Sequence, residues 1–259
     1  MTYTTKQFKQ DINGLLDSLR QQVATDSGEW SVRGFIDVYQ RIYPVTADTK
    51  VLSKLLELML FPILRDFAIK QGFEVALAEH QNHYPDLSLT GHGSRFALDI
   101  KTTYRTDHNR VNGMTLGSFT GYFRERKSTK NITFPYDSFT EHFVLGIIYS
   151  GVETPDDSRV YSLDQLASIP TVARDFELFV QEKFRIASDR PGSGNTTNIG
   201  SVTQLSALVN GDGPFSGLGH EVFSDYWMFY LTNDMARRAE LPHPPYHNLK
   251  EYLAYRGKL

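Results

Sequence analysis

A change of hydrophobic pattern at Gly72 constrains the fold of this chain more than any other feature of its sequence. Before Gly72, apolar residues recur at the spacing of an α-helix, and after it they fall into short runs that are typical of β-strands. These runs predict strands over residues 73–78, 87–89, 94–104 and 143–149. Helices around a mostly mixed central β-sheet make the expected fold class α/β (α+β).

Four helices are expected around this sheet. The first carries an apolar stripe over residues 8–19, and the second runs from near Asp48 to Gly72, with a bend or a break at Pro62. Neither a repeat nor a proline-rich linker divides the 259 residues, so we expect one domain over 1–259. The other two helices are expected at 172–184 and at 224–231, where Trp227, Phe229 and Tyr230 are the expected packing residues.

The absence of cysteine excludes several classes of function. A chain with no cysteine has no disulfide framework, zinc-thiolate site, iron–sulfur cluster or cysteine nucleophile. The His-Glu-x-x-His pattern of zinc peptidases and the Gly-Lys-Ser/Thr ending of an ATP-binding loop are also missing from the sequence. Neither a secretory signal nor a membrane-crossing stretch is recognised, so we expect a cytoplasmic protein with no membrane partner.

Charge is distributed unevenly along the chain. The 27 Lys and Arg against 30 Asp and Glu give a formal net charge of −3, yet residues 101–130 carry seven basic and only two acidic side chains. Such a segment is most often a solvated surface. The alternative is a contact surface for a polyanion such as nucleic acid.

Residues 191–201 are almost wholly small and polar, and we expect them to form a loop. One interpretation is a flexible surface turn. The other is a ligand-binding loop, in which glycines let the backbone approach the ligand closely while polar side chains supply hydrogen bonds.

Two carboxylates and a lysine are expected to meet on neighbouring strands. Pro85-Asp86 precedes one strand, and Asp99 and Lys101 lie two residues apart on the next. A glycine-containing hairpin of this length brings Asp86 beside Asp99, and the period of a strand puts Asp99 and Lys101 on one face. Paired carboxylates suit Mg²⁺, which keeps water and substrate phosphate as further ligands. The alternative is a surface ion pair that contributes little.

This group of residues suits the hydrolysis of phosphodiesters. The reaction needs an activated water, stabilisation of charge on the phosphoryl oxygens and a proton for the departing 3′ oxygen, all of which bound Mg²⁺ can supply. Lys101 is expected to orient the water and offset charge at the phosphate. It is not assigned as the general base because free lysine is protonated at neutral pH. Glu57, beside the apolar stripe of the second helix, is expected to reach the cleft as an additional metal or water ligand.

Five separated blocks of the sequence resemble the type II restriction endonucleases, in the same order and at nearly the same spacing. The most specific is the stretch Gly-Ser-Gly-Asn-Thr-Thr-Asn-Ile-Gly-Ser at 192–201. The similarity extends from about Ile42 to Trp227. The other blocks are residues 49–53 with 57–58, 81–86, 99–104 and 129–132.

This resemblance implies a restriction-endonuclease-like fold of the PD-(D/E)xK superfamily and a homodimer that cuts double-stranded DNA at a short palindrome. The cofactor it implies is Mg²⁺, for which Mn²⁺ substitutes. The implied target is GATATC, cut centrally to blunt ends with 5′-phosphates. Residues 31–44 correspond to the family's dimerisation region and 191–201 to its DNA-reading loop. A cognate DNA methyltransferase is expected in the same restriction-modification system.

Carried over residue by residue, the resemblance makes Asp86, Asp99 and Glu57 metal ligands and catalytic residues, and Lys101 the catalytic lysine. The implied DNA-binding residues lie on a major-groove loop, on a smaller minor-groove loop and beside the phosphates. They are Gln81, Asn82, Thr102, Thr103, Lys130, Gly192, Ser193, Gly194, Asn195, Thr196, Thr197 and Asn198.

Two features depart from the family pattern. His80 replaces a glutamine next to the minor-groove residues, which leaves those contacts open. An N-terminal extension of about a dozen residues has no counterpart. Two other functions stay open as alternatives: a structure-specific nuclease of the same fold, and a DNA-binding protein that has lost catalysis.

Overall fold

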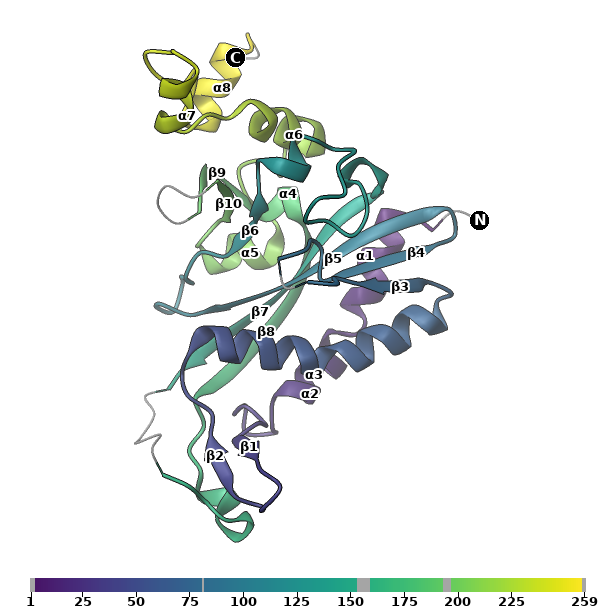
Figure 1. Cartoon of the computed structure of the whole chain (residues 1–259), viewed down its shortest axis with the longest axis vertical. Helices are drawn as coiled ribbons and strands as arrows, with labels where there is room; N and C mark the ends of the chain where they lie inside the picture. The colour runs from purple at the N-terminus through teal and green to yellow at the C-terminus, as the bar shows by residue number, and fades with distance from the viewer. Residues whose placement is uncertain (1–2, 81, 153–158, 193–196, 258–259) are drawn as a thin grey trace.

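The computed structural model describes residues 3–80, 82–152, 159–192 and 197–257. A five-stranded sheet with the order β3–β4–β5–β7–β8 lies at its centre (Figure 1). β5 and β7 are parallel and the other neighbours are antiparallel, so the expected mixed sheet is confirmed. Its strands are β3 (Glu74–Leu77), β4 (Leu87–Gly91), β5 (Ser94–Tyr104), β7 (Glu141–Gly151) and β8 (Ala173–Glu182).

Two smaller antiparallel sheets accompany the central one. The first is a hairpin of β1 (Gly34–Ile36) and β2 (Ile42–Pro44). The second has the order β6–β10–β9 and is built from β6 (Thr115–Ser118), β9 (Ala187–Pro191) and β10 (Asn198–Ser201). Residues 198–201 and Pro191 therefore belong to strands, and the loop predicted over 191–201 is wrong at both of its ends.

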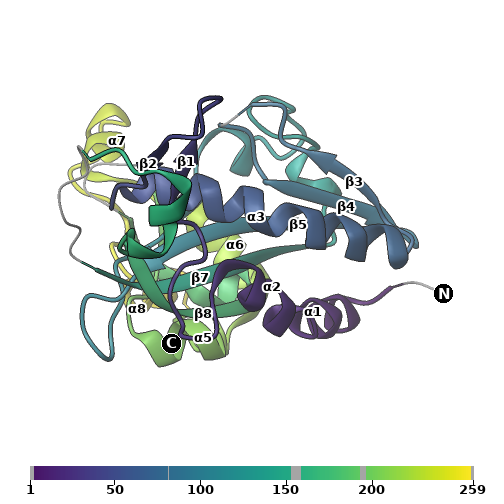
Figure 2. The same cartoon turned by 90° about the horizontal axis from the view of Figure 1, so that it is seen from below.

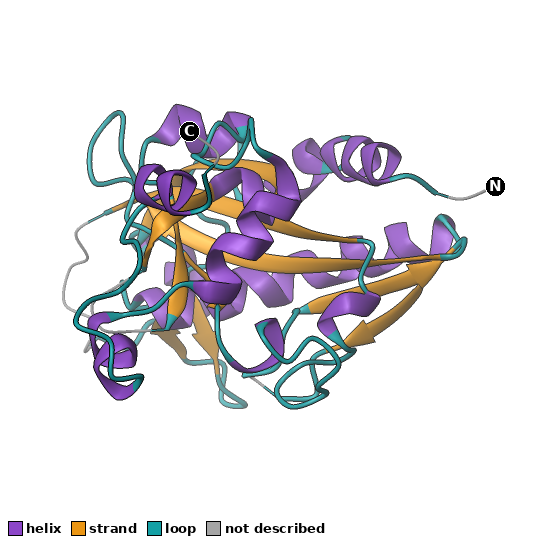
Figure 3. Ribbon diagram, turned by 90° about the horizontal axis from the view of Figure 1, so that it is seen from above, coloured by secondary structure: helices purple, strands orange, loops and turns teal. Residues whose placement is uncertain are grey.

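Helices cover both faces of the central sheet (Figures 2 and 3). One face packs against α1 (Thr5–Asn13), α2 (Leu16–Val23) and α3 (Thr49–Lys70). None of the helices described is long and apolar enough to cross a membrane. The remaining helical segments are α4 (Lys183–Ile186), α5 (Leu205–Asn210), α6 (Gly219–Phe229), α7 (Asn233–Arg238), α8 (Leu249–Tyr255) and the 3₁₀ helices η1 (Gly121–Phe123), η2 (Tyr136–Ser138) and η3 (Leu163–Ser168).

The alternation of side chains along β5 separates two hydrophobic cores. Phe96, Leu98 and Ile100 join the core under α1–α3, whereas Ala97 joins the opposite core, which includes Trp227 of α6. The period-2 pattern of this strand is thereby confirmed. The middle of β5 is therefore apolar on both faces, and the polar residues Asp99, Lys101, Thr102 and Thr103 lie towards its C-terminal end.

The helix predicted over residues 172–184 is wrong, because residues 173–182 form β8. Phe176, Leu178 and Val180 alternate along one face of the strand and pack in the core under α1–α3, while Phe179 packs in the opposite core. The apolar residues of this segment also recur at the spacing of a helix, so periodicity alone does not separate the two. They are Val172, Phe176, Phe179, Val180 and Phe184.

Three other predictions about helices need correction. The helix expected over residues 8–19 is two helices, because the chain turns at Gly14, whose N–H donates to Gln10 O. α3 passes through the exposed Pro62 as one helix of 22 residues and is not split there. In α6, Trp227 and the following Tyr230 are buried, but Phe229 is exposed.

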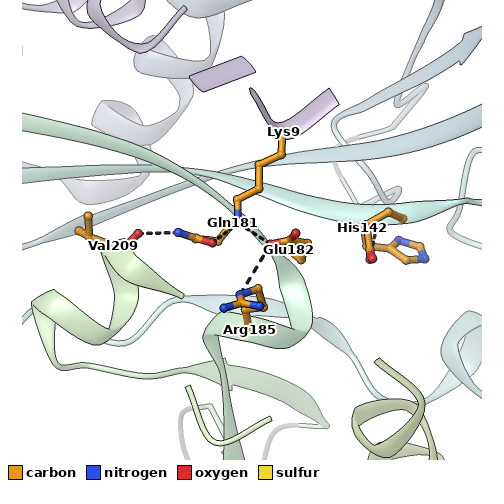
Figure 4. A network of polar contacts seen from close by, with 7 residues as sticks. Lys9, His142, Gln181, Glu182, Arg185 and Val209 are labelled. Carbon is orange, nitrogen blue, oxygen red and sulfur yellow. Dashed lines mark hydrogen bonds and ion pairs between the residues drawn. The ribbon is translucent and has the colours of Figure 1, made fainter. Parts of the chain in front are cut away.

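The N-terminal helix α1 is joined to the central sheet by ionic as well as apolar contacts. Lys9 Nζ lies 2.7 Å from Glu182 Oε2 and donates to Gln181 Oε1 at 2.6 Å, at the end of β8 (Figure 4). Gln181 in turn donates to Val209 O at 2.6 Å. This segment, which has no counterpart in the family pattern, is therefore an integral part of the fold.

Candidate active site

The β4–β5 hairpin places the first two carboxylates. Its two-residue turn, His92-Gly93, has φ of 53° and 75°, the left-handed conformation that tight hairpins require. The strands pair from Gly91 opposite Ser94 to Leu87 opposite Leu98. Asp86, one residue before β4, consequently lies beside Asp99, as the spacing predicts. Its Oδ2 accepts the N–H of Ile100 at 2.7 Å.

Lys101 lies between the two carboxylates. Its Nζ is 2.7 Å from Asp99 Oδ2 and 3.8 Å from Asp86 Oδ2. The side chain of Asp99 is 5% exposed, against 23% for Asp86 and 26% for Lys101. The structure therefore brings all three residues of the predicted group together, with Asp99 at the back and the other two towards solvent.

Burial and mutual charge shift the pKa values of this group. Burial raises the pKa of Asp86, the negative charge of Asp99 adds to that effect, and Lys101 and the Ile100 N–H oppose it. Burial disfavours the charged form of Lys101, but the carboxylates of Asp99 and Asp86 outweigh it and raise its pKa. Lys101 is thus held as a cation, a state that suits charge neutralisation and not proton abstraction.

A cleft of about 1040 Å³ opens over Asp86 and Lys101. The N-terminal half of α3 forms one wall with Lys50, Lys54 and Glu57, and the end of β5 forms another. The carboxylate of Glu57 is bound to Lys54 at 2.6 Å. Glu57 therefore faces the same cleft as the carboxylate pair, as expected, but its carboxylate is engaged along its own helix.

The donor chemistry of Asp86 and Asp99 fits a hard divalent cation. Carboxylate oxygens that converge on one point are ligands of Mg²⁺, and repulsion between them is what a cation would relieve. Among the described residues, no three acidic or histidine side chains gather closely enough to hold a metal ion. A site with two carboxylates leaves the remaining ligand positions to water and to an anionic substrate.

Two of the residues predicted to contact DNA lie at this cleft, and a third lies beside the segment that precedes Asp86. Thr102 and Thr103 both line it, although the hydroxyl of the buried Thr103 donates to Asn112 O at 2.5 Å. Lys130 is exposed, next to Asn131, whose carbonyl accepts the N–H of Tyr84 at 3.1 Å. This hydrogen bond places the neighbour of Lys130 beside the segment that leads to Asp86.

The predicted base-reading residues are described only in part. Asn82 is exposed in the segment before β4, whereas Gln81 lies outside the described residues. Gly192 donates its N–H to Asn198 O at 2.8 Å, and Thr197 O accepts the N–H of Phe119 at 2.9 Å. Ser193, Gly194, Asn195 and Thr196 also lie outside the described residues.

The basic segment 101–130 does not form one free surface. Lys101 is paired with Asp99, and Arg105 with Glu177 at 2.7 Å. Arg124 donates to Tyr230 O, whereas Lys127 is exposed. The excess positive charge is therefore divided between internal ion pairs and solvent.

Sequence reasoning missed three lysines around the site. Lys50 and Lys54 line the cleft from α3, and their spacing with Ser53 and Glu57 along one helical face was the available signal. Lys183 is buried behind the site, where burial lowers its pKa to about 7 while the charge of Asp99 opposes the shift. Its sequence neighbourhood gave no signal, because its burial depends on contacts between distant segments.

A mixed sheet with a lysine and two carboxylates at the ends of paired strands suits metal-assisted chemistry on a phosphodiester, which is the chemistry of a nuclease. The family model of "Restriction endonuclease EcoRV" matches residues 26–257. The type II restriction enzyme EcoRV of Escherichia coli is 38% identical over 240 residues, which cover 90% of this chain and 94% of that enzyme. The chain therefore belongs to the EcoRV family of type II restriction endonucleases, and its fold is restriction-endonuclease-like.

A solved structure is also similar to this one. The NlaIV restriction endonuclease matches with a TM-score of 0.45 and 13% identity, over 99% of this chain and 97% of that chain.

Proposed function

We propose that this protein is a Mg²⁺-dependent, homodimeric restriction endonuclease that hydrolyses double-stranded DNA at GATATC, with Mn²⁺ able to replace Mg²⁺. The observation that carries the proposal is the convergence of Asp86 and Asp99 on Lys101, where Asp86 and Lys101 line the cleft and Asp99 lies behind them. Membership of the EcoRV family supports DNA as the substrate. The stretch Gly192–Ser201, which matches the family's base-reading loop throughout, supports the target.

Each member of the site has a distinct task in this proposal. Asp86 and Asp99 would hold the cation, with Glu57 as an auxiliary carboxylate on the α3 wall. Bound Mg²⁺ supplies acidity to a coordinated water and stabilises charge on the phosphoryl oxygens. Lys101, held as a cation by its two neighbours, offsets the negative charge of the scissile phosphate. The side chain of Asp99 is almost fully buried, so its carboxylate is held in a fixed position in the site.

The homodimer is supported by exposed apolar side chains at one end of the molecule, opposite α7 and α8 (Figure 1). Some of them lie on the β1–β2 hairpin, within the dimerisation region expected at 31–44. The others lie on the segment around Tyr161, which pairs with Ile42 of β2. A palindrome presents two equivalent half-sites, so a two-fold dimer matches its symmetry. We call these residues the hairpin surface: Phe35, Ile36, Val38, Tyr39, Tyr43, Val160, Leu163 and Leu166.

Digestion of a plasmid with mapped GATATC sites tests the proposal. With Mg²⁺ we expect discrete fragments whose blunt ends map to the centre of each site and carry 5′-phosphates, and with a chelator we expect none. A smear that ignores the sites would instead support a structure-specific nuclease. Binding without cleavage across Mg²⁺ and Mn²⁺ titrations would support a DNA-binding protein that has lost catalysis. Protection of the plasmid by methylation of its sites would identify the cognate methyltransferase expected beside this enzyme.

A further inference from the structure

Lys183 is a buried lysine to which the proposed reaction gives no task. It is the first residue of α4 and is 2% exposed. Among the described residues, no group accepts a hydrogen bond from its amino group. Burial of an amine without such a partner lowers the stability of a fold. The position of this side chain therefore calls for a role other than stability.

Aromatic rings are the main surroundings of this amine. Lys183 Nζ lies 4.7 Å from the centroid of the Tyr84 ring and 5.7 Å from that of Tyr136. Tyr84 also stacks on Tyr122, with 5.4 Å between ring centroids. The face of an aromatic ring attracts N–H groups and cations. The ring of Tyr84 thus adjoins both the amine of Lys183 and the ring of Tyr122.

Gly117 of β6 closes the site from a third direction. Its φ is +96°, and a Cβ there would lie 3.3 Å from Lys183 Nζ and 2.9 Å from Tyr122 Oη. A side chain at this position would be strained by its backbone and would crowd both groups. Glycine therefore lets β6 approach the amine directly.

These contacts join parts of the chain that have different tasks in the proposed reaction. Tyr84 is separated from Asp86 only by Pro85. Lys183 stands where β8 of the central sheet ends and the chain enters β9, which leads to residues 191–201. Gly117 belongs to β6, which pairs with β10 on the other side of the same stretch. A shift of the β6–β10–β9 sheet consequently reaches the chain before Asp86 through Lys183, and also through Tyr122, which follows β6 and stacks on Tyr84.

We propose that Lys183 is a positioning residue for DNA cleavage, which holds Tyr84, and through it Asp86, in register with the β6–β10–β9 sheet. The inference rests on the proposed function for its effect on cleavage. Because Lys183 is buried away from the cleft surface, its loss acts on the chemical step and leaves DNA binding unchanged. A lysine that merely filled space would affect stability and not the position of Asp86.

The first test is Lys183→Met, which keeps the length of the side chain and removes the amine. We expect a thermal midpoint no lower than that of the unmutated protein, an unchanged Kd for a GATATC duplex in Ca²⁺, and a single-turnover cleavage rate in Mg²⁺ that is about 10- to 100-fold lower. The matched control, Lys6→Met on the exposed face of α1, should cut at the unmutated rate. Cleavage by K183M at the unmutated rate would overturn the proposal.

A second measurement needs neither metal nor DNA. Ile100 donates its N–H to Asp86 Oδ2, so the amide signal of Ile100 reports the position of that carboxylate. In protein labelled with ¹⁵N-isoleucine, K183M should shift this signal and speed its hydrogen exchange, and K6M should not. An unchanged Ile100 signal in K183M refutes the positioning role. This readout stays valid if the unmutated protein fails to cut, which would be a failure of the proposed function alone.

The third test is a double-mutant cycle with Tyr84→Leu, which removes the ring and keeps the lysine. If both residues act through one contact, Y84L slows cleavage to a similar degree and the double variant is no slower than either single variant. Rate losses that multiply in the double variant would show two independent effects and would overturn the proposal. If K183M does not fold, Y84L alone tests the proposal. A Y84L variant whose cleavage rate and Ile100 signal match those of the unmutated protein would refute the role of the Lys183–Tyr84 contact.

Discussion

Asp99 is the residue on which the electrostatics of the site converge. Its carboxylate is almost fully buried and contacts Lys101, and its charge acts on Asp86, on Lys101 and on the buried Lys183. Removal of this charge therefore leaves two lysines without their main counter-charge. The charge of Asp99 thus helps to keep Lys101 protonated, beside the role of metal ligand that we propose for it.

Asp99→Asn is expected to abolish cleavage without unfolding the protein. The amide keeps the shape of the side chain but is a poor ligand for Mg²⁺, so we expect the single-turnover rate to fall by at least about 1000-fold. Without a divalent cation, a gel-shift assay should show DNA bound at least as tightly as by the unmutated protein, because one repulsive charge beside the phosphate is gone. Cleavage by D99N at the unmutated rate would show that Asp99 is not a catalytic residue.

Glu141 gives the metal-free protein a pH-dependent stability. Burial raises its pKa to about 7, the N–H that His142 donates to it at 2.8 Å opposes this, and the charge of Glu182 adds to it. A free glutamate has a pKa of about 4.3. Because the folded state holds this proton more tightly, the stability that Glu141 contributes below about pH 4 is lost as the pH rises through about 7.

Glu141→Gln should remove this loss, since the amide oxygen can still accept the His142 N–H. We expect the variant to be more stable than the unmutated protein by about 1 to 2 kcal/mol at pH 8, and equally stable at pH 4. Urea denaturation at the two pH values measures the difference. A difference of the same size at both pH values would show that ionisation of Glu141 is not its cause.

At the residue scale, the sequence predicted what depends on local period and short connections. The face shared by Asp99 and Lys101 follows from the alternation of a strand, and the approach of Asp86 follows from a short hairpin. The pairing of Glu57 with Lys54 and the burial of Lys183 depend on how helices and distant strands pack, and periodicity carries no information about that.

Among the helices and strands, the wrong predictions concern segments whose structure depends on their tertiary contacts. β5 was predicted with its observed bounds because polar residues mark its alternation. β8 was taken for a helix because Val172, Phe176, Phe179 and Val180 recur at helical spacing, and because the apolar run Leu178–Val180 interrupts the period of two. Gly14 divides α1 from α2, whereas Pro62 lies on the exposed side of α3 and leaves it in one piece.

The N-terminal helix α1, outside the residues that the family model matches, is expected to be essential for folding. Phe8 is 0% exposed, and its ring stacks on Phe96 of β5 with 4.3 Å between centroids and lies 5.0 Å from that of Phe143 of β7. Phe8→Ala should cost about 3 to 5 kcal/mol in the free energy of unfolding, measured in urea. Lys6→Ala, exposed on the same helix, should change it by less than about 0.5 kcal/mol. A small effect of F8A would show that α1 is dispensable.

At the scale of the whole molecule, one chain supplies one Asp86–Asp99–Lys101 group. Cleavage of both strands of a palindrome needs two such groups related by a two-fold axis. The hairpin surface, at the end of the molecule away from α7 and α8, is the exposed apolar region that a second copy would cover. Contiguous apolar side chains that face water are typical of such contact surfaces.

Ile36→Glu tests this arrangement, because the side chain is 58% exposed and its replacement leaves the core intact. Two-fold symmetry places two copies of the new charge near each other in a desolvated contact, which should weaken dimerisation by at least about 100-fold. Sedimentation should show a folded monomer, and plasmid cleavage should fall in parallel and recover at high protein concentration. Leu241→Glu, an equally simple change at an exposed leucine outside the hairpin surface, should leave both unchanged. If I36E sediments and cuts like the unmutated protein, the two copies meet through another face, and the two active sites must be aligned on the DNA by contacts that do not include β1 and β2.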